Sequence, residues 1–246
     1  SVDTFFQHKV HKAGLNACVL VAEGGKVIYK NSFGYEDYSR KTKLSDSSEF
    51  QLASVSKPFT ATAILLLNEQ GKLNINDPVA KYIDGFPYEE ITIKTLLNHR
   101  SGLPNYLYLF DTLKLPADSF ISNIDVVNYF VRNKPPLQAT PNHKFQYCNS
   151  NYALLAYIVE KVSGEHFKDF MQENIFQPSH MSDTYVRDVF DSTQHHHETK
   201  GYVGSKWVKV SAVPYDGVLG DKGVYTTSWD LYLFDQALNN GLLLGK

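Results

Sequence analysis

Ser54 and Lys57 are the first residues of this sequence whose types and spacing suggest chemistry. They are the first and last residues of the S-x-x-K tetrapeptide Ser54-Val55-Ser56-Lys57. At the start of a helix, this spacing places both side chains on one face, one turn apart. A serine hydroxyl is a weak nucleophile until a base takes its proton, and a lysine can serve as that base when burial and positive surroundings lower its pKa. Unpaired backbone N–H groups at a helix N-terminus can also stabilise an oxyanion. The tetrapeptide therefore suggests a nucleophilic serine with an adjacent base.

The same tetrapeptide has an ordinary structural interpretation. Ser and Lys three residues apart recur by chance in long chains, and a serine at the start of a helix most often caps it. On this alternative Lys57 is a solvated side chain of the first turn. Taken alone, the spacing favours the capping role, so the chemical interpretation depends on other motifs.

A second candidate group is the triplet Tyr147-Cys148-Asn149, just ahead of a predicted helix. In an extended segment residues i and i+2 share a face, so Tyr147 and Asn149 project together while Cys148 turns away. A phenol can shuttle a proton, and a carboxamide can anchor a substrate carbonyl or amide. The alternative is that Tyr147 is a packing residue and Asn149 a helix cap. We expect Cys148 to be packed and inert.

Predicted strands and helices position these residues at junctions. Two β-rich runs separated by Gly24-Gly25 predict an antiparallel hairpin, and residues 200–211 predict a second, smaller one. A short extended stretch over residues 49–53 leads into Ser54. The hairpin strands span residues 17–23 and 26–33, and helical periodicity predicts helices over 56–69, 92–99, 124–132, 151–162, 167–175 and 229–239.

Strands followed by a helical block predict an α+β fold. We expect an antiparallel sheet flanked by helices plus a helical subdomain, in a single domain over residues 1–246. Residues 1–60 would hold the sheet and the start of the nucleophile helix, and about 61–195 the mainly helical subdomain. The predicted sheet is incomplete, because a lone N-terminal hairpin leaves its edge N–H and C=O groups unpaired.

Composition excludes several classes of function. The chain of 246 residues has 43% hydrophobic and 20% charged residues and a net charge of −2, which gives no electrostatic basis for binding nucleic acid. No run approaches the roughly 18–20 apolar residues of a transmembrane helix. Cys18 and Cys148 stand far apart without C-x-x-C spacing, so neither a zinc ribbon nor a disulfide framework is indicated.

The run His195-His196-His197 followed by Glu198 resembles a metal-binding cluster only in composition. Consecutive side chains point in different directions in regular structure, so they do not form a chelating face. We expect a solvated loop and no metal site.

Four ordered segments together resemble the serine β-lactamase and penicillin-binding-protein superfamily. The nearest branch contains class C β-lactamases, D-alanyl-D-alanine carboxypeptidases and family VIII-like esterases, and the resemblance covers nearly the whole chain. The segments are Phe50-Gln51-Leu52-Ala53-Ser54-Val55-Ser56-Lys57, Leu96-Leu97-Asn98-His99-Arg100-Ser101-Gly102-Leu103-Pro104, Tyr147-Cys148-Asn149-Ser150-Asn151-Tyr152 and Gly220-Asp221-Lys222-Gly223-Val224-Tyr225-Thr226-Thr227.

The resemblance implies a β-lactamase/transpeptidase-like fold and a role for each candidate residue. Ser54 would attack a carbonyl with Lys57 helping to deprotonate it, and the Ser54 N–H would form half of the oxyanion hole. Tyr147 would be the general base or proton relay, and Asn149 the amide that orients the substrate. No cofactor is implied. Periplasmic or secreted placement follows from the resemblance alone.

The loop after the second predicted helix is expected to support the site. His99 and Ser101 would be scaffold residues there rather than reactants. Tyr106, Tyr108 and Phe110, which follow this loop, could shape a substrate-binding rim.

One expected motif is absent. The family carries Lys-Thr-Gly or His-x-Gly on a strand that lines the pocket, and no such triplet follows Tyr147. Lys94-Thr95 is followed by Leu96 inside a predicted helix, so it does not fill that role. Either the chain is a piece of a longer product or it has naturally lost half of the pocket, and we expect the former. Weak or no turnover by the isolated chain is expected in both cases, since one lost oxyanion donor costs about 10²–10³ in rate.

The resulting hypothesis is a serine hydrolase that forms an acyl-enzyme on Ser54 with an amide, a β-lactam or an ester. Its substrate would be a small molecule or a peptidoglycan-like peptide. A plain esterase acting on small acyl esters is one alternative. A non-catalytic penicillin-binding-protein-like module that binds peptidoglycan or a protein partner is another, and the absent third motif favours it. The sequence leaves the oligomeric state open.

Overall fold

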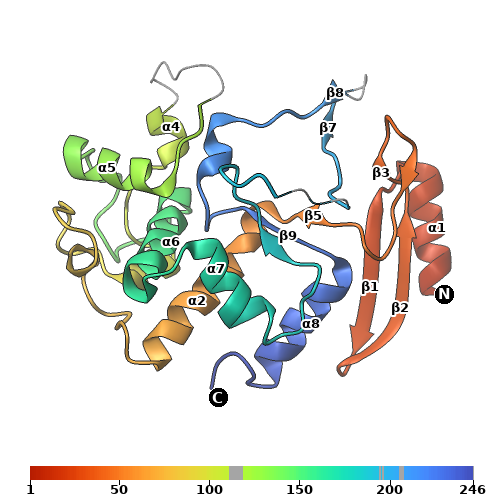
Figure 1. The fold of residues 1–246 in the computed structure, drawn as a ribbon, viewed down its shortest axis with the longest axis horizontal. Coiled ribbons are helices and arrows are strands. Elements are labelled where there is room, and N and C mark those ends of the chain that lie inside the picture. The colour runs from red at the N-terminus through yellow and green to blue at the C-terminus, as the bar shows by residue number, and fades with distance from the viewer. Residues whose placement is uncertain (111–118, 194, 196, 205–207, 246) are drawn as a thin grey trace.

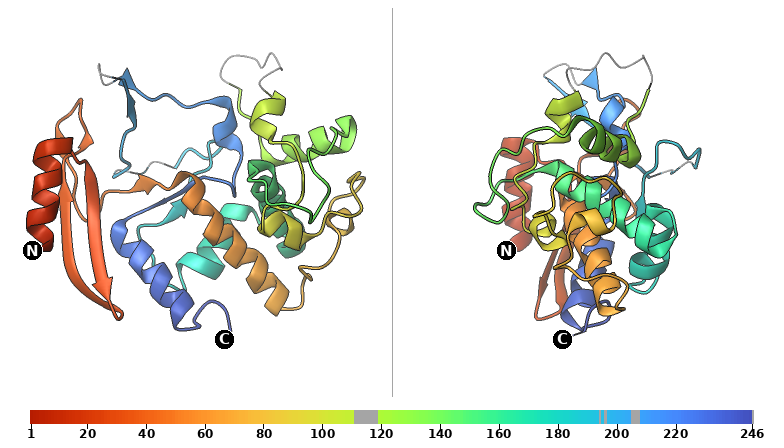
Figure 2. Two further views of the ribbon diagram at one scale, coloured as in Figure 1. Left: turned by 180° about the vertical axis from the view of Figure 1, so that it is seen from behind. Right: turned by 90° about the vertical axis from the view of Figure 1, so that its left-hand side faces the viewer.

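The computed structural model describes residues 1–110, 119–193, 195, 197–204 and 208–245. The N-terminal helix α1 (Val2–Ala13) and a β-hairpin form one end of the molecule, and α4 (Tyr106–Phe110) and α5 (Asn123–Asn133) lie toward the opposite end (Figures 1 and 2). A small sheet and the remaining helices lie between these two ends (Figure 1). The expected division at about residue 60 stays a prediction.

The N-terminal hairpin forms where the glycine pair predicts it. β1 (Ala17–Glu23) and β2 (Lys26–Phe33) pair antiparallel, and Gly24 and Gly25 adopt the positive φ angles, 56° and 73°, that the turn requires. The predicted strand boundaries are confirmed. Among the described residues this hairpin remains a two-stranded sheet, so it is incomplete as expected.

The helix α1 is not among the predicted elements. Phe6 stacks on Tyr29 and Phe33 of β2, with ring centroids 5.6 and 6.3 Å apart, and the Tyr29 hydroxyl donates to Asp3 at 2.8 Å. No residue of α1 is fully buried. A helix that rests on a surface in this way has a weak apolar stripe, so the sequence pattern gives little sign of it.

A three-stranded antiparallel sheet carries the chain into the candidate site. Its order is β5 (Phe50–Gln51), β9 (Val224–Thr226) and β6 (Tyr185–Val186), with β9 in the centre. β9 is not among the predicted elements either, because three residues are too few to show a strand period. Its central place brings the segment that begins at Gly220 beside Ser54.

Six helices confirm the helical predictions, with boundaries shifted by a few residues at most. Only α7 differs in kind, because it continues as one π-helical turn, η3 (Gln172–Phe176). None of the helices in the described part of the chain has the length and apolar character that a membrane crossing needs. The six are α2 (Lys57–Glu69), α3 (Ile93–Leu97), α5, α6 (Asn149–Ser163), α7 (Phe167–Met171) and α8 (Ser228–Asn239).

Short elements connect these layers. The second predicted hairpin exists as β7 and β8, although residues 205–207 at its tip lie outside the described residues. The short elements are β3 (Tyr35–Asp37), β4 (Thr42–Lys43), η1 (Ala53–Ser56), η2 (Val79–Lys81), β7 (Tyr202–Val203), β8 (Val208–Lys209) and η4 (Pro214–Gly217).

The helix α6 is the centre of the hydrophobic core. Leu154, Leu155, Ile158 and Val159 are fully buried, and α2, α3, α5 and α7 pack around them. Burial of each such side chain stabilises the folded protein by about 1.5–3 kcal/mol. A shift of α6 against α2 would expose some of these side chains, so the packing fixes where α6 begins relative to α2. Both helices start at the candidate site, so the core determines its geometry.

Gly220 occupies a position that no other residue fits. Its φ is +94°, and a Cβ there would lie 2.5 Å from the Tyr152 carbonyl oxygen and 2.6 Å from the Ala156 Cβ. Gly220→Ala should therefore lower the free energy of unfolding by about 3 kcal/mol, since left-handed strain and overpacking add. Urea denaturation measures this loss.

Gly164→Ala is the matched control. Gly164 also has a left-handed backbone, with φ +79°, but no atom lies within 4 Å of the position of a Cβ. Only the backbone penalty of about 1 kcal/mol applies there. Equal losses in the two variants would show that contact with α6 does not constrain Gly220.

Candidate active site

Ser54 stands on a sharp turn between a strand and a helix. β5 ends at Gln51, and Ala53 adopts the left-handed conformation, with φ 46°, which is strained for a residue with a Cβ. Ser54 follows in the turn η1, and its side chain is exposed. The predicted strand is shorter than expected, and α2 begins at Lys57, so Ser54 lies just outside the helix.

The Ser54 hydroxyl accepts hydrogen bonds from both predicted partners. Lys57 Nζ donates to Ser54 Oγ at 3.1 Å, and the Tyr147 hydroxyl donates to the same oxygen at 2.7 Å. The Lys57 amine also lies 5.0 Å from the centroid of the Tyr147 ring. An amine and a phenol thus reach one hydroxyl within the distance that proton transfer needs.

Lys57 is a buried amine with a polar anchor. Only 5% of the residue is exposed, and Nζ donates to the Asp221 carbonyl at 2.8 Å. The Tyr152 ring lies on another side of it, with its centroid 5.7 Å from Nζ. These contacts hold the amine toward Ser54 instead of leaving it in solvent, which argues against the solvated alternative.

Asn149 stands apart from the other three predicted residues. It is the first residue of α6, so the helix begins two residues earlier than predicted and Cys148 is the capping position. In the described part of the chain no hydrogen bond links Asn149 to Ser54, Lys57 or Tyr147. Among the described residues its buried Oδ1 accepts no hydrogen bond, which is unusual for a buried amide oxygen.

His99 accepts hydrogen bonds from the backbone of the residues directly before and after Tyr147. The His99 carbonyl accepts from the Gln146 N–H at 2.7 Å, and the His99 Nδ1 accepts from the Cys148 N–H at 3.2 Å. The His99 and Tyr147 rings lie 4.5 Å apart between centroids. Burial, and next the positive charge of Lys57, lower the pKa of His99 to about 4, so the ring is neutral and Nδ1 is free to accept.

Ser101 and Cys148 belong to the hydrogen-bonded surroundings of His99. The Ser101 hydroxyl donates to Asn151 Oδ1 at 2.6 Å, and the Asn151 amide nitrogen lies 3.2 Å from His99 Nδ1. Cys148 is 2% exposed, and burial raises the pKa of its thiol. The expectations of a scaffold at Ser101 and an inert thiol at Cys148 agree with these positions.

The expected aromatic rim is mostly wrong. Tyr106 and Phe110 point into the core, with exposures of 0% and 5%, because α4 turns that face toward the other helices. Only Tyr108 is exposed, at 71%. Phe145 and Tyr147, on the segment before α6, are also exposed and adjoin His99.

Asp221 and Lys222 are site residues to which the sequence analysis assigns no role. Asp221 is 3% exposed and provides the carbonyl that holds Lys57, and Lys222 lies 3.6 Å from the Asp221 carboxylate. A local signal exists, because two charged residues stand between glycines in an otherwise apolar stretch. Such charges are buried only when they are paired, so this pattern points to a buried pair.

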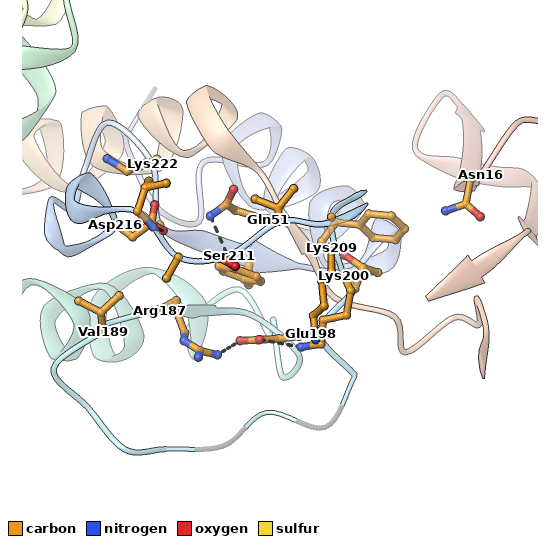
Figure 3. A pocket seen from close by; sticks show the side chains of 18 residues that line it. Asn16, Gln51, Arg187, Val189, Glu198, Lys200, Lys209, Ser211, Asp216 and Lys222 are labelled. Atoms are coloured by element: carbon orange, nitrogen blue, oxygen red, sulfur yellow. Dashed lines mark hydrogen bonds and ion pairs between the residues drawn. The ribbon is translucent and has the colours of Figure 1, made fainter. Parts of the chain in front are cut away.

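A cavity lies along β5 and β9, and Ser54 is not among the residues that line it. It measures about 720 Å³, and Gln51 and Tyr225 of the central sheet contribute to its lining (Figure 3). Arg187 and Lys200 both pair with Glu198 at its edge. The cavity along β5 and β9 therefore has a mixed lining of polar and apolar side chains.

The histidine run gives no metal site within the described residues. The His195 ring stacks on Tyr185, and the His197 Nδ1 lies 3.9 Å from a Glu36 carboxylate oxygen. His196 lies outside the described residues. The prediction for the whole run is therefore tested only in part.

Comparison with known sequences shows the protein family to which this chain is similar. The family model described as Beta-lactamase matches residues 2–246. Penicillin-binding protein 4* of Bacillus subtilis (strain 168) is 38% identical over 261 residues, covering 100% of this chain and 57% of that protein. The putative penicillin-binding protein PbpX of the same strain is 30% identical over 239 residues, covering 95% and 57%. The chain spans little more than half the length of these relatives.

Two kinds of solved structure share the arrangement of helices and strands. A penicillin-binding protein from Bacillus halodurans superposes with a TM-score of 0.82 at 26% identity, covering 98% of this chain and 74% of that one. D-amino acid amidase from Ochrobactrum anthropi SV3, solved with L-phenylalanine amide, superposes with a TM-score of 0.76 at 25% identity, covering 94% and 65%.

Acidification should destabilise the protein through His99. The pKa is about 4 in the folded protein against an ordinary value of 6.5, so the unfolded chain takes up this proton at a higher pH. The contribution is fully present above about pH 6.5 and is lost as the pH falls toward about 4, a difference of about 3 kcal/mol. Urea denaturation at a series of pH values measures it.

His99→Gln removes the titrating group and should flatten this pH dependence. The control is His8→Gln, the same substitution at an exposed position on α1, which should keep the wild-type dependence. A wild-type slope in His99→Gln would contradict the assignment to His99.

Proposed function

Because this chain belongs to the beta-lactamase family, we propose that it is a serine hydrolase that forms an acyl-enzyme on Ser54 with an amide, β-lactam or ester substrate. The family and the β-lactamase/transpeptidase-like fold expected from the four motifs are confirmed. The observation that carries the proposal is the pair of hydrogen bonds that Lys57 and Tyr147 donate to Ser54 Oγ.

In the proposed acylation, Ser54 Oγ forms a bond to the substrate carbonyl carbon. Its proton passes to whichever of the Lys57 amine and the Tyr147 phenol is unprotonated, and both are within hydrogen-bond distance. The tetrahedral intermediate then loses its leaving group, which takes that proton. In the second step the same base takes a proton from water, which attacks the carbonyl carbon of the acyl-enzyme. The bond to Ser54 Oγ then breaks, Ser54 regains its proton and the acid product leaves.

Two further groups are proposed to bind the substrate. The Ser54 N–H would donate to the oxyanion. The Asn149 Oδ1, which is buried and has no hydrogen-bond partner among the described residues, would accept an N–H from the substrate once its side chain turns toward the site, which suits an amide or a peptide.

The proposed substrate class is based on the relatives and structural neighbours of this chain. Its relatives include penicillin-binding proteins, and a structural neighbour is a D-amino acid amidase. A small amide or a peptidoglycan-like peptide is therefore proposed as the substrate, and periplasmic or secreted placement goes with it. Since the chain spans 57% of its relatives, turnover by the whole protein belongs to this proposal as well.

Covalent labelling tests the nucleophile. Incubation with a fluorescent penicillin or a fluorophosphonate should add one adduct to Ser54, detected by intact mass and peptide mapping, because its hydroxyl is exposed and adjoins two bases. Ser54→Ala should abolish the adduct. Ser47→Ala, at an exposed serine of a loop, should leave it unchanged.

The outcomes separate the alternatives. A folded protein that neither reagent labels would overturn the proposal and favour a non-catalytic binding module. Hydrolysis of p-nitrophenyl acetate without reaction with penicillin would indicate a plain esterase. Activity that survives Ser54→Ala would show that the nucleophile is another residue.

Tyr147→Phe tests the phenol. The variant loses the hydroxyl that donates to Ser54 Oγ at 2.7 Å while the ring keeps its contact with His99. The acylation rate should fall about 10²–10⁴-fold, the usual contribution of a proton-transfer group. Stopped-flow or timed labelling measures the rate, and Tyr157→Phe on α6 is the matched control with the wild-type rate expected. A loss below threefold in Tyr147→Phe would exclude this role.

A further inference from the structure

The turn of residues 220–224 is fastened to the nucleophile turn and the start of α2. Four hydrogen bonds cross between these segments, which are far apart in sequence. They join Leu52 N–H to the Val224 carbonyl (2.9 Å), Val224 N–H to Ser56 Oγ (3.1 Å), Lys57 Nζ to the Asp221 carbonyl (2.8 Å) and Thr60 Oγ1 to the Gly220 carbonyl (2.8 Å).

The Asp221 side chain lies in a buried network of its own. The Tyr106 hydroxyl donates to Asp221 Oδ2 at 3.0 Å, and Lys222 Nζ donates to the Tyr106 oxygen at 2.8 Å. Asp221 Oδ1 accepts no hydrogen bond from the residues that the structure describes and lies 3.6 Å from Lys222 Nζ. Burial raises the pKa of Tyr106, and the charge of Asp221 adds to the effect, so the phenol remains a donor.

A small set of groups surrounds the Lys57 amine. The Tyr147 and Tyr152 rings lie beside it, the Asp221 carbonyl accepts its hydrogen bond, and the titratable groups of His99, Asp221 and Lys222 interact with it electrostatically. Burial raises the pKa of Asp221, while the charges of Lys222 and Lys57 oppose that rise. Among these described groups, Asp221 supplies the carboxylate.

We propose that the buried carboxylate of Asp221 is a positioning group for the nucleophile, which acts by balancing the charge of the Lys57 amine that the Asp221 carbonyl holds. Tyr106 and Lys222 keep this carboxylate in place. A carboxylate near an amine favours its charged form, whereas a second ammonium disfavours it. Asp221 and Lys222 therefore have opposite effects on how readily the base beside Ser54 loses its proton. The inference rests on the proposed function, because it concerns activation of Ser54.

A purely structural role predicts something different. Loss of a buried ion pair destabilises the fold in either single variant, and activity then falls in both without a change in pH dependence. Opposite shifts of the pH profile cannot arise from loss of stability. The pH profile of acylation thus separates positioning from scaffolding.

The experiment is the rate constant of Ser54 acylation from pH 5 to 9, above the pKa of about 4 at His99. Asp221→Asn should move the acidic limb to lower pH by about one unit, because loss of a neighbouring negative charge disfavours the charged form of the amine. Lys222→Met should move it to higher pH. The double variant should return close to the wild-type limb.

Asp230→Asn is the matched control. Asp230 is 1% exposed, and its Oδ1 also accepts no hydrogen bond, but its contacts are with Asp183 and Thr184. This variant should unfold at a lower temperature and keep the wild-type limb. A shift in Asp230→Asn as large as in Asp221→Asn would overturn the proposal.

Other outcomes are equally decisive. An unmoved limb in both single variants, with Ser54 still acylated, would overturn the positioning role and leave the proposed function standing. If Asp221→Asn does not fold, Lys222→Met alone decides, because an upward shift supports the proposal and an unchanged limb refutes it. Failure of the wild-type protein to acylate at any pH would overturn both proposals.

Discussion

A single oxygen atom, Ser54 Oγ, has to meet two partners that reach it by different routes. Lys57 arrives through local geometry, three residues along the chain, whereas the Tyr147 hydroxyl comes from 93 residues away and must approach to 2.7 Å. A hydrogen bond at that distance tolerates little displacement. The helices α2 and α6 share one buried core, and this shared packing fixes the two approaches relative to each other.

Buried polar groups orient the side chains of the site, which hydrophobic packing alone does not do. His99 orders the backbone on both sides of Tyr147, and the Asp221 carbonyl holds the Lys57 amine. Hydrogen bonds are directional, so such contacts set the orientation of a side chain as well as its depth. The site therefore depends on groups that do not themselves touch the hydroxyl.

Family membership and geometry contribute different parts of the functional argument. The family gives the broad class, that of serine hydrolases. The geometry shows that this chain places an amine and a phenol on one exposed serine, and that an amide oxygen on Asn149 is left without a partner.

The N-terminal hairpin, six of the helices and the first pair of the site could be predicted from the sequence alone. Gly24-Gly25 sets the hairpin turn, and the S-x-x-K spacing places Lys57 beside Ser54, because both depend only on neighbouring residues. The burial of Tyr106, the central place of β9 and the contact of Asp221 with Lys57 depend on how distant segments pack together. Local periodicity carries no information on which distant segments pair, since that is settled by how the whole core packs.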